Sequence, residues 1–242
     1  PETLKKGIHA VEYYPELPSR FAVIPKYGNQ DDIMWFEADP TYVLHWTNAY
    51  EEGDEVVLDG YFQECPKPPN HPNAPAGLSR IMGFLANDLL RPRLHRWRFN
   101  LKTGETTEQR LEDDIREFGV INALYQGVDY RYIYSLINTK GYFQFDGFSK
   151  SDLETGERQD YMFGEQRYGS EPAFAPRLNP QSEDDGYVVS IITDTKLDRS
   201  EFVMFDASDI TAGPVCQIIL PHRISSGVHG TWARGEELNE PE

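Results

Sequence analysis

The sequence predicts an all-β fold with a recurring hairpin that favours the blades of a β-propeller, and three observations lead to this prediction. Aromatic and β-branched residues gather in short runs bounded by Gly, Asn, Asp and Pro, which is the pattern of strands joined by turns. A polar turn that carries a glycine recurs three times along the chain. One stretch interrupts the strands with the three- and four-residue apolar spacing of a helix.

The apolar and aromatic runs define ten expected strands, each bounded by residues that favour turns. They are Arg20–Pro25, Ile33–Glu37, Tyr42–Thr47, Glu55–Gln63, His95–Leu101, Tyr130–Ile137, Tyr142–Asp146, Gly186–Thr193, Glu201–Asp206 and Cys216–Leu220. The helical segment is expected over Ala76–Leu90, because its leucines, Ile81 and Met82 form one apolar stripe. Pro92 ends it, since proline cannot continue a helix.

The three polar turns end at Gly104, Gly156 and Gly213. The spacings are 156 − 104 = 52 and 213 − 156 = 57 residues. A hairpin that recurs at roughly 50 residues fits four-stranded propeller blades, and three unrelated hairpins are the alternative. At that length the chain supplies about four blades, which form either a small closed ring or an incomplete one.

The charge balance excludes several classes of function. The 242 residues carry 23 basic and 40 acidic side chains, so the formal net charge is −17. Nucleic-acid binding needs a basic face, and docking on an anionic membrane by charge alone needs one too. No apolar stretch reaches the roughly 18 residues of a transmembrane helix. We therefore expect one domain over residues 1–242, without a nucleic-acid partner.

The two cysteines, Cys65 and Cys216, are too few for a disulfide framework. We expect free, buried thiols in a reducing compartment, which favours a cytoplasmic location. The chain begins at Pro1 without an initiator methionine. We therefore expect either a processed chain or a piece of a longer one.

Six histidines remain as candidates for chemistry, because the short motifs of zinc, nucleotide and nucleophile sites are absent from the sequence. His45 follows an apolar run, so it is either a buried histidine with a hydrogen-bond partner or a metal ligand or base. His229 lies between Gly227 and Gly230, which either form a tight turn or let the backbone approach a site. His222, beside Arg223, is interpreted as a structural or surface residue.

Four segments resemble the carotenoid cleavage oxygenase family, which includes lignostilbene dioxygenases and the retinal pigment epithelial membrane protein type. His45–Glu51 (HWTNAYE) is similar to the family's His-x-x-Asn-Ala-aromatic-Glu segment. Glu117–Asn122 is similar to its Glu-Phe-Pro-x-Ile-Asn segment, and Gly169–Arg177 to its Gly-Glu-Pro-x-Phe-x-Pro-Arg segment. Gly227–Trp232 resembles its C-terminal Gly-Phe-His-Gly motif. The four segments follow one another in the family's order.

The resemblance implies a seven-bladed β-propeller, of which this chain supplies roughly the C-terminal half. It also implies an Fe(II) ion held by four histidines, with glutamates hydrogen-bonded to the imidazoles. In this chain His45 and His229 match the third and fourth ligands, and Glu117 and Glu171 match two of the glutamates. The other two histidines and the third glutamate belong upstream of Pro1, so residues 1–242 are expected to be a partial propeller domain whose N-terminal blades are missing.

The function implied is a non-haem Fe(II) dioxygenase that uses O2 to split a C=C bond into two carbonyl products. Its substrate is an apolar conjugated molecule, either a carotenoid or apocarotenoid or a stilbene-type compound. Trp46, Phe174 and Trp232 are candidates to line its binding site, and packing in the core is the alternative for such aromatic residues.

Several expectations stay open at this point. The stripe of the helical segment packs on the sheet, borders the substrate entrance or makes peripheral contact with a membrane. Two imidazoles bind iron weakly, so we expect these 242 residues alone to be inactive. The alternatives to a dioxygenase are a non-catalytic binding propeller and an isomerohydrolase on the same scaffold.

Overall fold

The computed structural model describes residues 13–64, 66, 87–139, 141, 144–225, 227–236 and 238 of the chain. The chain forms two compact units. The first is Pro1–Glu117 with Gly127–Asp129 and Asn138–Phe143, and the second is Phe118–Gln126, Tyr130–Ile137 and Gln144–Glu242. His9, Cys65, His71 and most of the expected helix Ala76–Leu90 lie outside the described residues. No helix in the described part of the chain is long and apolar enough to span a membrane.

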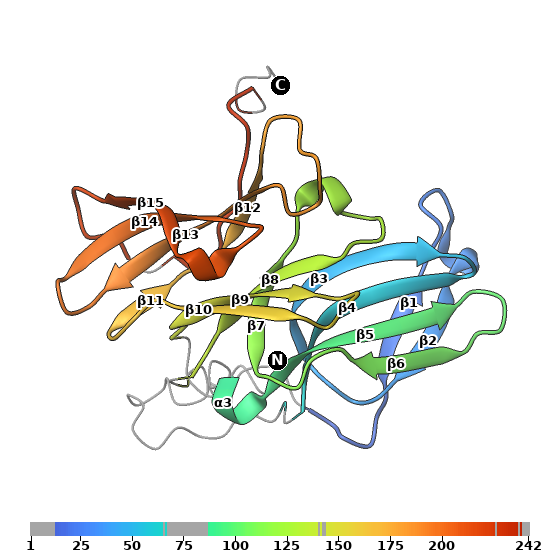
Figure 1. The fold of residues 1–242 in the computed structure, drawn as a ribbon. Helices are drawn as coiled ribbons and strands as arrows, with labels where there is room; N and C mark the ends of the chain where they lie inside the picture. Colours follow the sequence, from blue (N-terminus) through green and yellow to red (C-terminus); the bar gives the residue numbers. More distant parts are fainter. Residues whose placement is uncertain are drawn as a thin grey trace. The chain divides into compact units, whose positions relative to one another are not determined.

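The prediction of an all-β fold is confirmed, since the strands of the described residues form four antiparallel sheets (Figure 1). The strands are β1 (Ser19–Val23), β2 (Met34–Ala38), β3 (Val43–Glu52), β4 (Glu55–Gln63), β5 (Pro92–Asn100), β6 (Thr106–Arg110), β7 (Arg116–Val120), β8 (Tyr132–Ile137), β9 (Gly147–Asp152), β10 (Arg158–Met162), β11 (Arg167–Gly169), β12 (Ala173–Pro176), β13 (Gly186–Asp194), β14 (Arg199–Asp206) and β15 (Pro214–Ile219). The helix α3 (Asn87–Leu90) is the described end of the expected helical segment, and η1 (Gln30–Asp32), η2 (Ala123–Tyr125) and η3 (Ile210–Ala212) are single 3₁₀ turns.

Each sheet is built from strands that follow one another in sequence. The orders are β1-β2, β3-β4-β5-β6, β7-β8-β9-β10 and β11-β13-β14-β15, with β12 also paired to β13. The division between the two units falls inside β7. The prediction of a seven-bladed ring stays a prediction.

The recurring glycine turns occupy equivalent places in three sheets. The turn at Gly104 joins β5 to β6, the turn at Gly156 joins β9 to β10, and the turn at Gly213 leads into β15 after β14. All three glycines have positive φ angles, of 76°, 74° and 87°, which other residues adopt only with strain. The repeat seen in the sequence is therefore the connection between the last two strands of each sheet.

The sequence analysis missed six strands. It also predicted a strand over Tyr142–Asp146, which is wrong for residues 144–146. The missed strands are β6, β7, β9, β10, β11 and β12. Of these, β6 (TTEQR) and β10 (RQDYM) are outer strands rich in polar residues, so they lack the apolar alternation that identified the others. Residues 144–146 form no strand, and Phe145 makes only an isolated bridge to Gly169.

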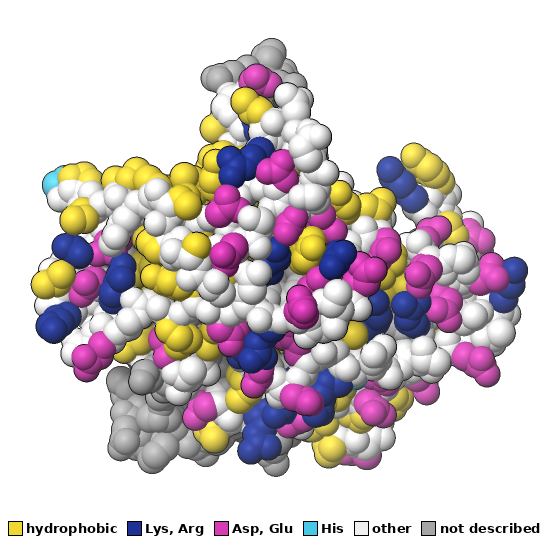
Figure 2. All heavy atoms as spheres, viewed as in Figure 1, with side chains coloured by type: hydrophobic (Ala, Val, Ile, Leu, Met, Phe, Trp, Pro, Cys, Tyr) yellow, Lys and Arg dark blue, Asp and Glu magenta, His cyan; other side chains and the backbone are white. Residues whose placement is uncertain are grey.

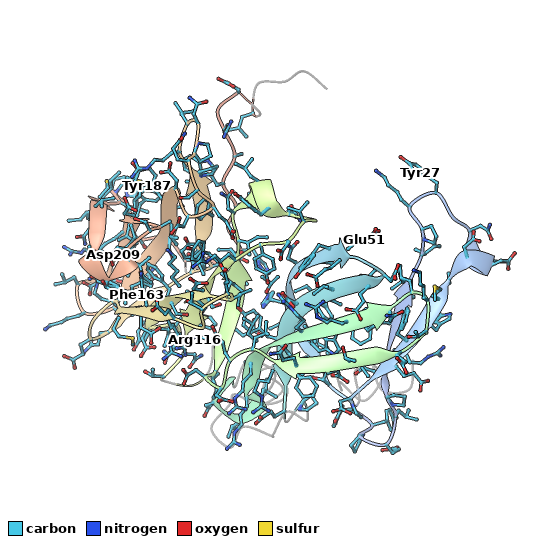
Figure 3. All side chains as sticks on the ribbon, turned by 45° about the vertical axis from the view of Figure 1, so that its right-hand side comes forward. Tyr27, Glu51, Arg116, Phe163, Tyr187 and Asp209 are labelled. Atoms are coloured by element: carbon cyan, nitrogen blue, oxygen red, sulfur yellow. The ribbon has the colours of Figure 1, made fainter. Side chains whose placement is uncertain are left out.

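The first unit has an aromatic core between the β1–β2 hairpin and the sheet β3–β6. Phe36, Trp97 and Phe99 are almost completely buried, and Phe21 packs against both Trp97 and Phe99 with ring centroids 5.7 and 4.9 Å away. Tyr27, at the tip of the loop after β1, is 92% exposed and points away from the strands (Figure 3). The hairpin thus contributes its inner face to the core.

A buried ion pair crosses the same sheet between β4 and β5. Asp59 is fully buried, and Arg96 donates two hydrogen bonds to its carboxylate at 2.9 and 2.8 Å. The guanidinium also lies over the Tyr50 ring, 5.9 Å from its centroid. Removal of the carboxylate would leave a largely buried guanidinium without its main partner.

The second unit has its own core, centred on Phe148 of β9. Its ring meets Phe163, Phe205 and Tyr161, with centroid separations between 4.7 and 6.2 Å. The strand β15 is the edge of its sheet, and a row of hydrophobic side chains runs along it (Figure 2). Val215, Ile218 and Ile219 in this row are each more than half exposed.

We predict that Asp59→Ala lowers the free energy of unfolding by about 3 kcal/mol, because it removes the carboxylate that compensates the largely buried Arg96 charge. Urea unfolding followed by tryptophan fluorescence measures the change. Asp54→Ala is the matched control, since Asp54 pairs with Lys102 on the surface of the same sheet. Its cost should stay below about 1 kcal/mol. Equal decreases in the free energy of unfolding for the two variants would contradict a larger contribution from the buried pair.

Candidate metal centre

His45 lies in an irregular part of β3. The strand pairs Val43 with Phe62, Trp46 with Gly60 and Asn48 with Asp59, so its register to β4 shifts twice within six residues. Between the first two pairs, two residues of β3 face a single residue of β4, which defines a β-bulge. A bulge bends a strand and re-aims side chains, so the direction of His45 is set by this local irregularity.

The opposite strand accommodates the bulge by having glycine at position 60. A Cβ atom on Gly60 would lie 2.6 Å from Cε3 of Trp46 and 3.2 Å from the carbonyl oxygen of His45. Trp46 therefore lies directly over the backbone of β4. Its ring also meets Trp97 edge-on, with centroids 5.4 Å apart, and about half of the residue stays exposed.

The His45 imidazole is held by a buried carboxylate. Its Nδ1 lies 2.6 Å from Oε2 of Glu117, and both residues belong to the first unit. The Glu117 side chain is 1% exposed and that of His45 is 17% exposed. A carboxylate at Nδ1 favours the tautomer with its proton on that atom, so the lone pair of Nε2 becomes the one that can bind a metal.

Glu117 comes from the beginning of β7, directly after Arg116, which Figure 3 labels. The next residue, Phe118, has a φ angle of +54°, although aromatic residues rarely adopt this left-handed conformation. Its ring is buried and lies 5.3 Å from that of Phe145 and 5.5 Å from that of His229. Backbone strain of this kind is often found at functional sites.

His229 is held in the same way inside the second unit. Its Nδ1 lies 3.1 Å from Oε2 of Glu171, and the backbone N–H of Gly230 donates to the same oxygen at 2.8 Å. A Cβ atom on Gly230 would lie 3.6 Å from the Glu171 carbonyl oxygen, and one on Gly227 would lie 3.7 Å from Ser170. The backbone of this segment therefore runs beside Ser170 and Glu171, at a distance that would also admit alanine.

Glu171 lies in a gap between two short strands that share one edge of their sheet. The strand β11 ends at Gly169 and β12 begins at Ala173, and both pair with β13. Pro172 has no N–H to donate, so the ladder cannot run unbroken through it. The carboxylate of Glu171 can then bind His229 and Gly230 from the gap between the two strands.

The two pairs share one chemical design: an imidazole whose Nδ1 faces a largely buried carboxylate. This arrangement is typical of histidines that bind metals, and imidazole nitrogen suits iron. Each pair by itself therefore has the chemistry of a metal-binding imidazole with its carboxylate partner, and a metal ion that has both His45 and His229 as ligands stays a prediction. Within the described residues no group of three or more His, Cys, Asp or Glu side chains could by itself hold a metal ion.

The other histidines have different surroundings. His95 lies in β5, 3.1 Å from a carboxylate oxygen of Glu108, and packs between Phe62 and Trp97. Burial lowers the pKa of His95, and the Glu108 carboxylate opposes this shift. His222 is exposed, as the sequence suggests. Both are therefore outside the candidate centre.

The three residues predicted to line a substrate site differ in exposure. Trp46 and Trp232 are each 47% exposed, whereas Phe174 is 5% exposed and packs against Tyr134 with ring centroids 5.5 Å apart. Phe174 also covers Gly186, where a Cβ atom would lie 2.6 Å from its ring. Their contact with a substrate stays a prediction.

The second unit contains a polar cavity of about 530 Å3. Lys150 in its wall donates to Asp184 at 2.6 Å and to the Ser208 carbonyl at 3.0 Å, and Arg131 donates twice to Asp152. These charges are paired with one another, and such a wall does not suit an apolar molecule. We therefore place no substrate there.

Two residues near the centre were not singled out in the sequence. Asn48, three positions after His45, binds the backbone of residues 127–128 through its side chain. Phe118 has the strained backbone described above. Asn48 lies in a recognisable motif, which could have drawn attention to it, whereas the sequence carries no sign of the positive φ at Phe118.

Residues 1–234 match the family described as retinal pigment epithelial membrane protein. Over 254 residues the chain is 33% identical to carotenoid 9,10(9',10')-cleavage dioxygenase 1 of Arabidopsis thaliana, covering 98% of this chain and 44% of that protein. Over 245 residues it is 30% identical to isoeugenol monooxygenase of Pseudomonas putida, covering 96% and 49%. The chain thus spans about half the length of the curated relatives it matches.

A solved structure supports the same relationship. The crystal structure of a cobalt-substituted apocarotenoid oxygenase from Synechocystis has a TM-score of 0.81 to this chain at 27% sequence identity. The match covers 92% of this chain and 45% of that structure.

We predict that Glu171→Ala accelerates hydrogen exchange at Gly230 about fivefold, because its N–H loses the acceptor oxygen and a hydrogen bond contributes about 1 kcal/mol. Exchange of the peptide that covers residues 227–232, followed by mass spectrometry, measures this. Glu171→Gln keeps an oxygen acceptor and should retain most of the protection. Unchanged exchange in Glu171→Ala would show that this hydrogen bond does not hold the segment.

Proposed function

This chain belongs to the retinal pigment epithelial membrane protein family of carotenoid oxygenases, and on that premise we propose that the whole protein is a non-haem Fe(II) dioxygenase. The reaction is the cleavage of a C=C bond with O2 to give two carbonyl products. The observation that carries the proposal is the pairing of two imidazoles with largely buried carboxylates, His45 with Glu117 and His229 with Glu171. These histidines are the ones that match the family's ligand motifs.

The protein side chains have a defined task in this reaction. Glu117 and Glu171 accept hydrogen bonds from the Nδ1–H groups of their histidines, which fixes the ring orientations and would leave Nε2 of each imidazole to hold the metal. When bound, Fe(II) supplies a site where O2 binds and becomes reactive. The two carboxylates bind the imidazoles and do not bind the metal. Their negative charge therefore acts on the metal through the histidines.

The proposed substrate is an apolar conjugated molecule with an alkene bond. The relatives named above act on carotenoids or isoeugenol by name, which supports this class and leaves the choice between a carotenoid and a stilbene-type compound to experiment. Trp46 and Trp232 each present a half-exposed indole that can contact such a molecule. Phe174, which is buried, is proposed to support this wall from behind.

We propose the seven-bladed propeller of the family for the whole protein, and the three larger antiparallel sheets support three of its blades. The strands β3 and β7, and the pair β11 and β12, come first in these sheets. They carry His45, Glu117 and, between β11 and β12, Glu171. We also propose a cytoplasmic location, supported by the free thiol of half-buried Cys216.

We predict that His45→Ala and His229→Ala, made in the whole protein, each lower bound iron below about a tenth of the wild-type content and abolish alkene cleavage, because each removes an imidazole ligand. Elemental analysis measures iron, and chromatography of the products from an apocarotenoid and a stilbene measures cleavage. His222→Ala is the control, since His222 is exposed in the same C-terminal segment and should change neither quantity.

The outcomes separate the candidate functions. Iron-free wild-type protein that binds an apolar ligand would overturn the proposal in favour of a non-catalytic binding propeller. Wild-type protein that contains iron but releases an isomerised alcohol from a retinyl ester would identify an isomerohydrolase. Two carbonyl products, formed only while both histidines are present, are the expected result.

A further inference from the structure

The side chain of Asn48 forms a clamp on a neighbouring loop. Its Nδ2 donates to the carbonyl oxygen of Val128 at 3.0 Å, and its Oδ1 accepts the N–H of Gly127, also at 3.0 Å. The N–H and the carbonyl belong to consecutive residues, so one side-chain amide holds the loop at two points. Asn48 is 6% exposed, and its loss would therefore remove two hydrogen bonds made by a buried amide.

The clamp lies at the end of the irregular part of β3. The second register shift falls between Trp46 and Asn48, and regular pairing with β4 continues from Asn48 to Glu52. His45 lies inside the first shift, between the pairings of Val43 and Trp46, where the ladder does not fix its direction. Asn48 follows the second shift and is held on two sides, by β4 through its backbone and by the loop through its side chain.

The loop that Asn48 binds is continuous with the strand that carries Glu117. Residues 121–131 connect β7 to β8. Within this connection, Gly127 and Val128 contact β3 through Asn48. Gly127 has a φ angle of +83°, which suits glycine and turns its N–H toward Asn48. The clamp and the His45–Glu117 contact therefore both bind β3 within the first unit, one at Gly127 and Val128 and the other at Glu117.

A second observation places the loop along β3. Burial raises the pKa of Tyr50 to about 12, Arg96 opposes this shift, and the carboxylate of Asp129 adds to it. Such an effect requires Asp129 to lie near Tyr50. Residues 127–129 therefore run alongside residues 48–50, in agreement with the two hydrogen bonds of Asn48.

We propose that Asn48 is a positioning residue for the metal centre: it holds the loop after β7 against β3, so that the Glu117 carboxylate meets Nδ1 of His45. This inference rests on the proposed function, because the purpose of the contact is to orient a metal-binding imidazole. Asn48 itself touches neither metal nor substrate in this role. Its side chain is needed for its paired donor and acceptor, and alanine supplies neither.

The test compares Asn48→Ala with Asn100→Ala in the whole protein. Asn100 accepts hydrogen bonds from the backbone N–H groups of Lys102 and Thr103 in the β5–β6 turn, so its loss weakens the same sheet away from the centre. Affinity for Co(II), measured by competition with a chelator, and the visible spectrum of the Co(II) form report on the ligand geometry. Thermal unfolding reports on the stability of each variant.

Asn48→Ala should weaken Co(II) binding about tenfold, as the loss of outer partners of metal ligands does, and should alter the Co(II) spectrum. Asn100→Ala should lower the unfolding temperature while affinity and spectrum stay as in the wild type. Wild-type affinity in Asn48→Ala, or equal weakening in both variants, would overturn the positioning role. A wild-type protein that takes up no metal would instead overturn the proposed function together with this inference.

A double-variant cycle tests the path of the effect. If Asn48 acts through the His45–Glu117 contact, then Asn48→Ala added to Glu117→Gln should weaken Co(II) binding by no more than about twofold beyond Glu117→Gln alone. Independent contributions would multiply, so the double variant would lose the product of the two single losses. That result would overturn the proposed path.

Discussion

The hydrogen bond between His45 Nδ1 and the buried Glu117 carboxylate is the interaction on which the candidate centre depends. A carboxylate that is 1% exposed is costly unless a partner compensates it, and an imidazole N–H provides such a partner. The same contact fixes which ring nitrogen carries the proton. One hydrogen bond therefore both compensates the buried carboxylate and leaves the other ring nitrogen able to bind a metal.

This contact requires a side-chain direction that a regular ladder does not give. In a regular strand the side chains alternate between two faces, and their direction follows from the pairing register. The protein departs from regularity at each residue of the centre. The strand β3 has bulges on both sides of Trp46, Phe118 follows Glu117 with a positive φ angle, and Glu171 lies in the gap between β11 and β12.

The sequence predicts the all-β fold class, which is confirmed, and a candidate centre, which stays a prediction, by different signals. Apolar alternation found β4 with its observed limits and eight strands in part, because their side chains have one buried face. Polar strands such as β6 and β10 gave no such signal, although their glycine turns did. The candidate centre was predicted through the resemblance of its motifs, and the structure places His45 beside Glu117 and His229 beside Glu171.

Other features could not be read from the residues, because they arise from contacts between distant segments. Nothing in the letters around Glu117 specifies the φ angle of Phe118, which depends on the packing of its ring against Phe145 and His229. The clamp of Asn48 joins positions 79 and 80 residues apart in the chain. Long-range contacts of this kind become visible only in three dimensions.

The first and the last strands of the larger sheets differ in regularity. The last two strands of each larger sheet are joined by a connection that carries a glycine with positive φ, and they form regular ladders apart from one shift between β14 and β15. The first strands carry the bulges, the gap and the strained residue, which cost stability because they forgo ladder hydrogen bonds. Since the neighbouring strands supply regular pairing and buried aromatic residues, the first strands can keep these irregularities. Replacement of the first strands by regular ones would therefore be expected to stabilise the sheets and to misdirect the imidazoles.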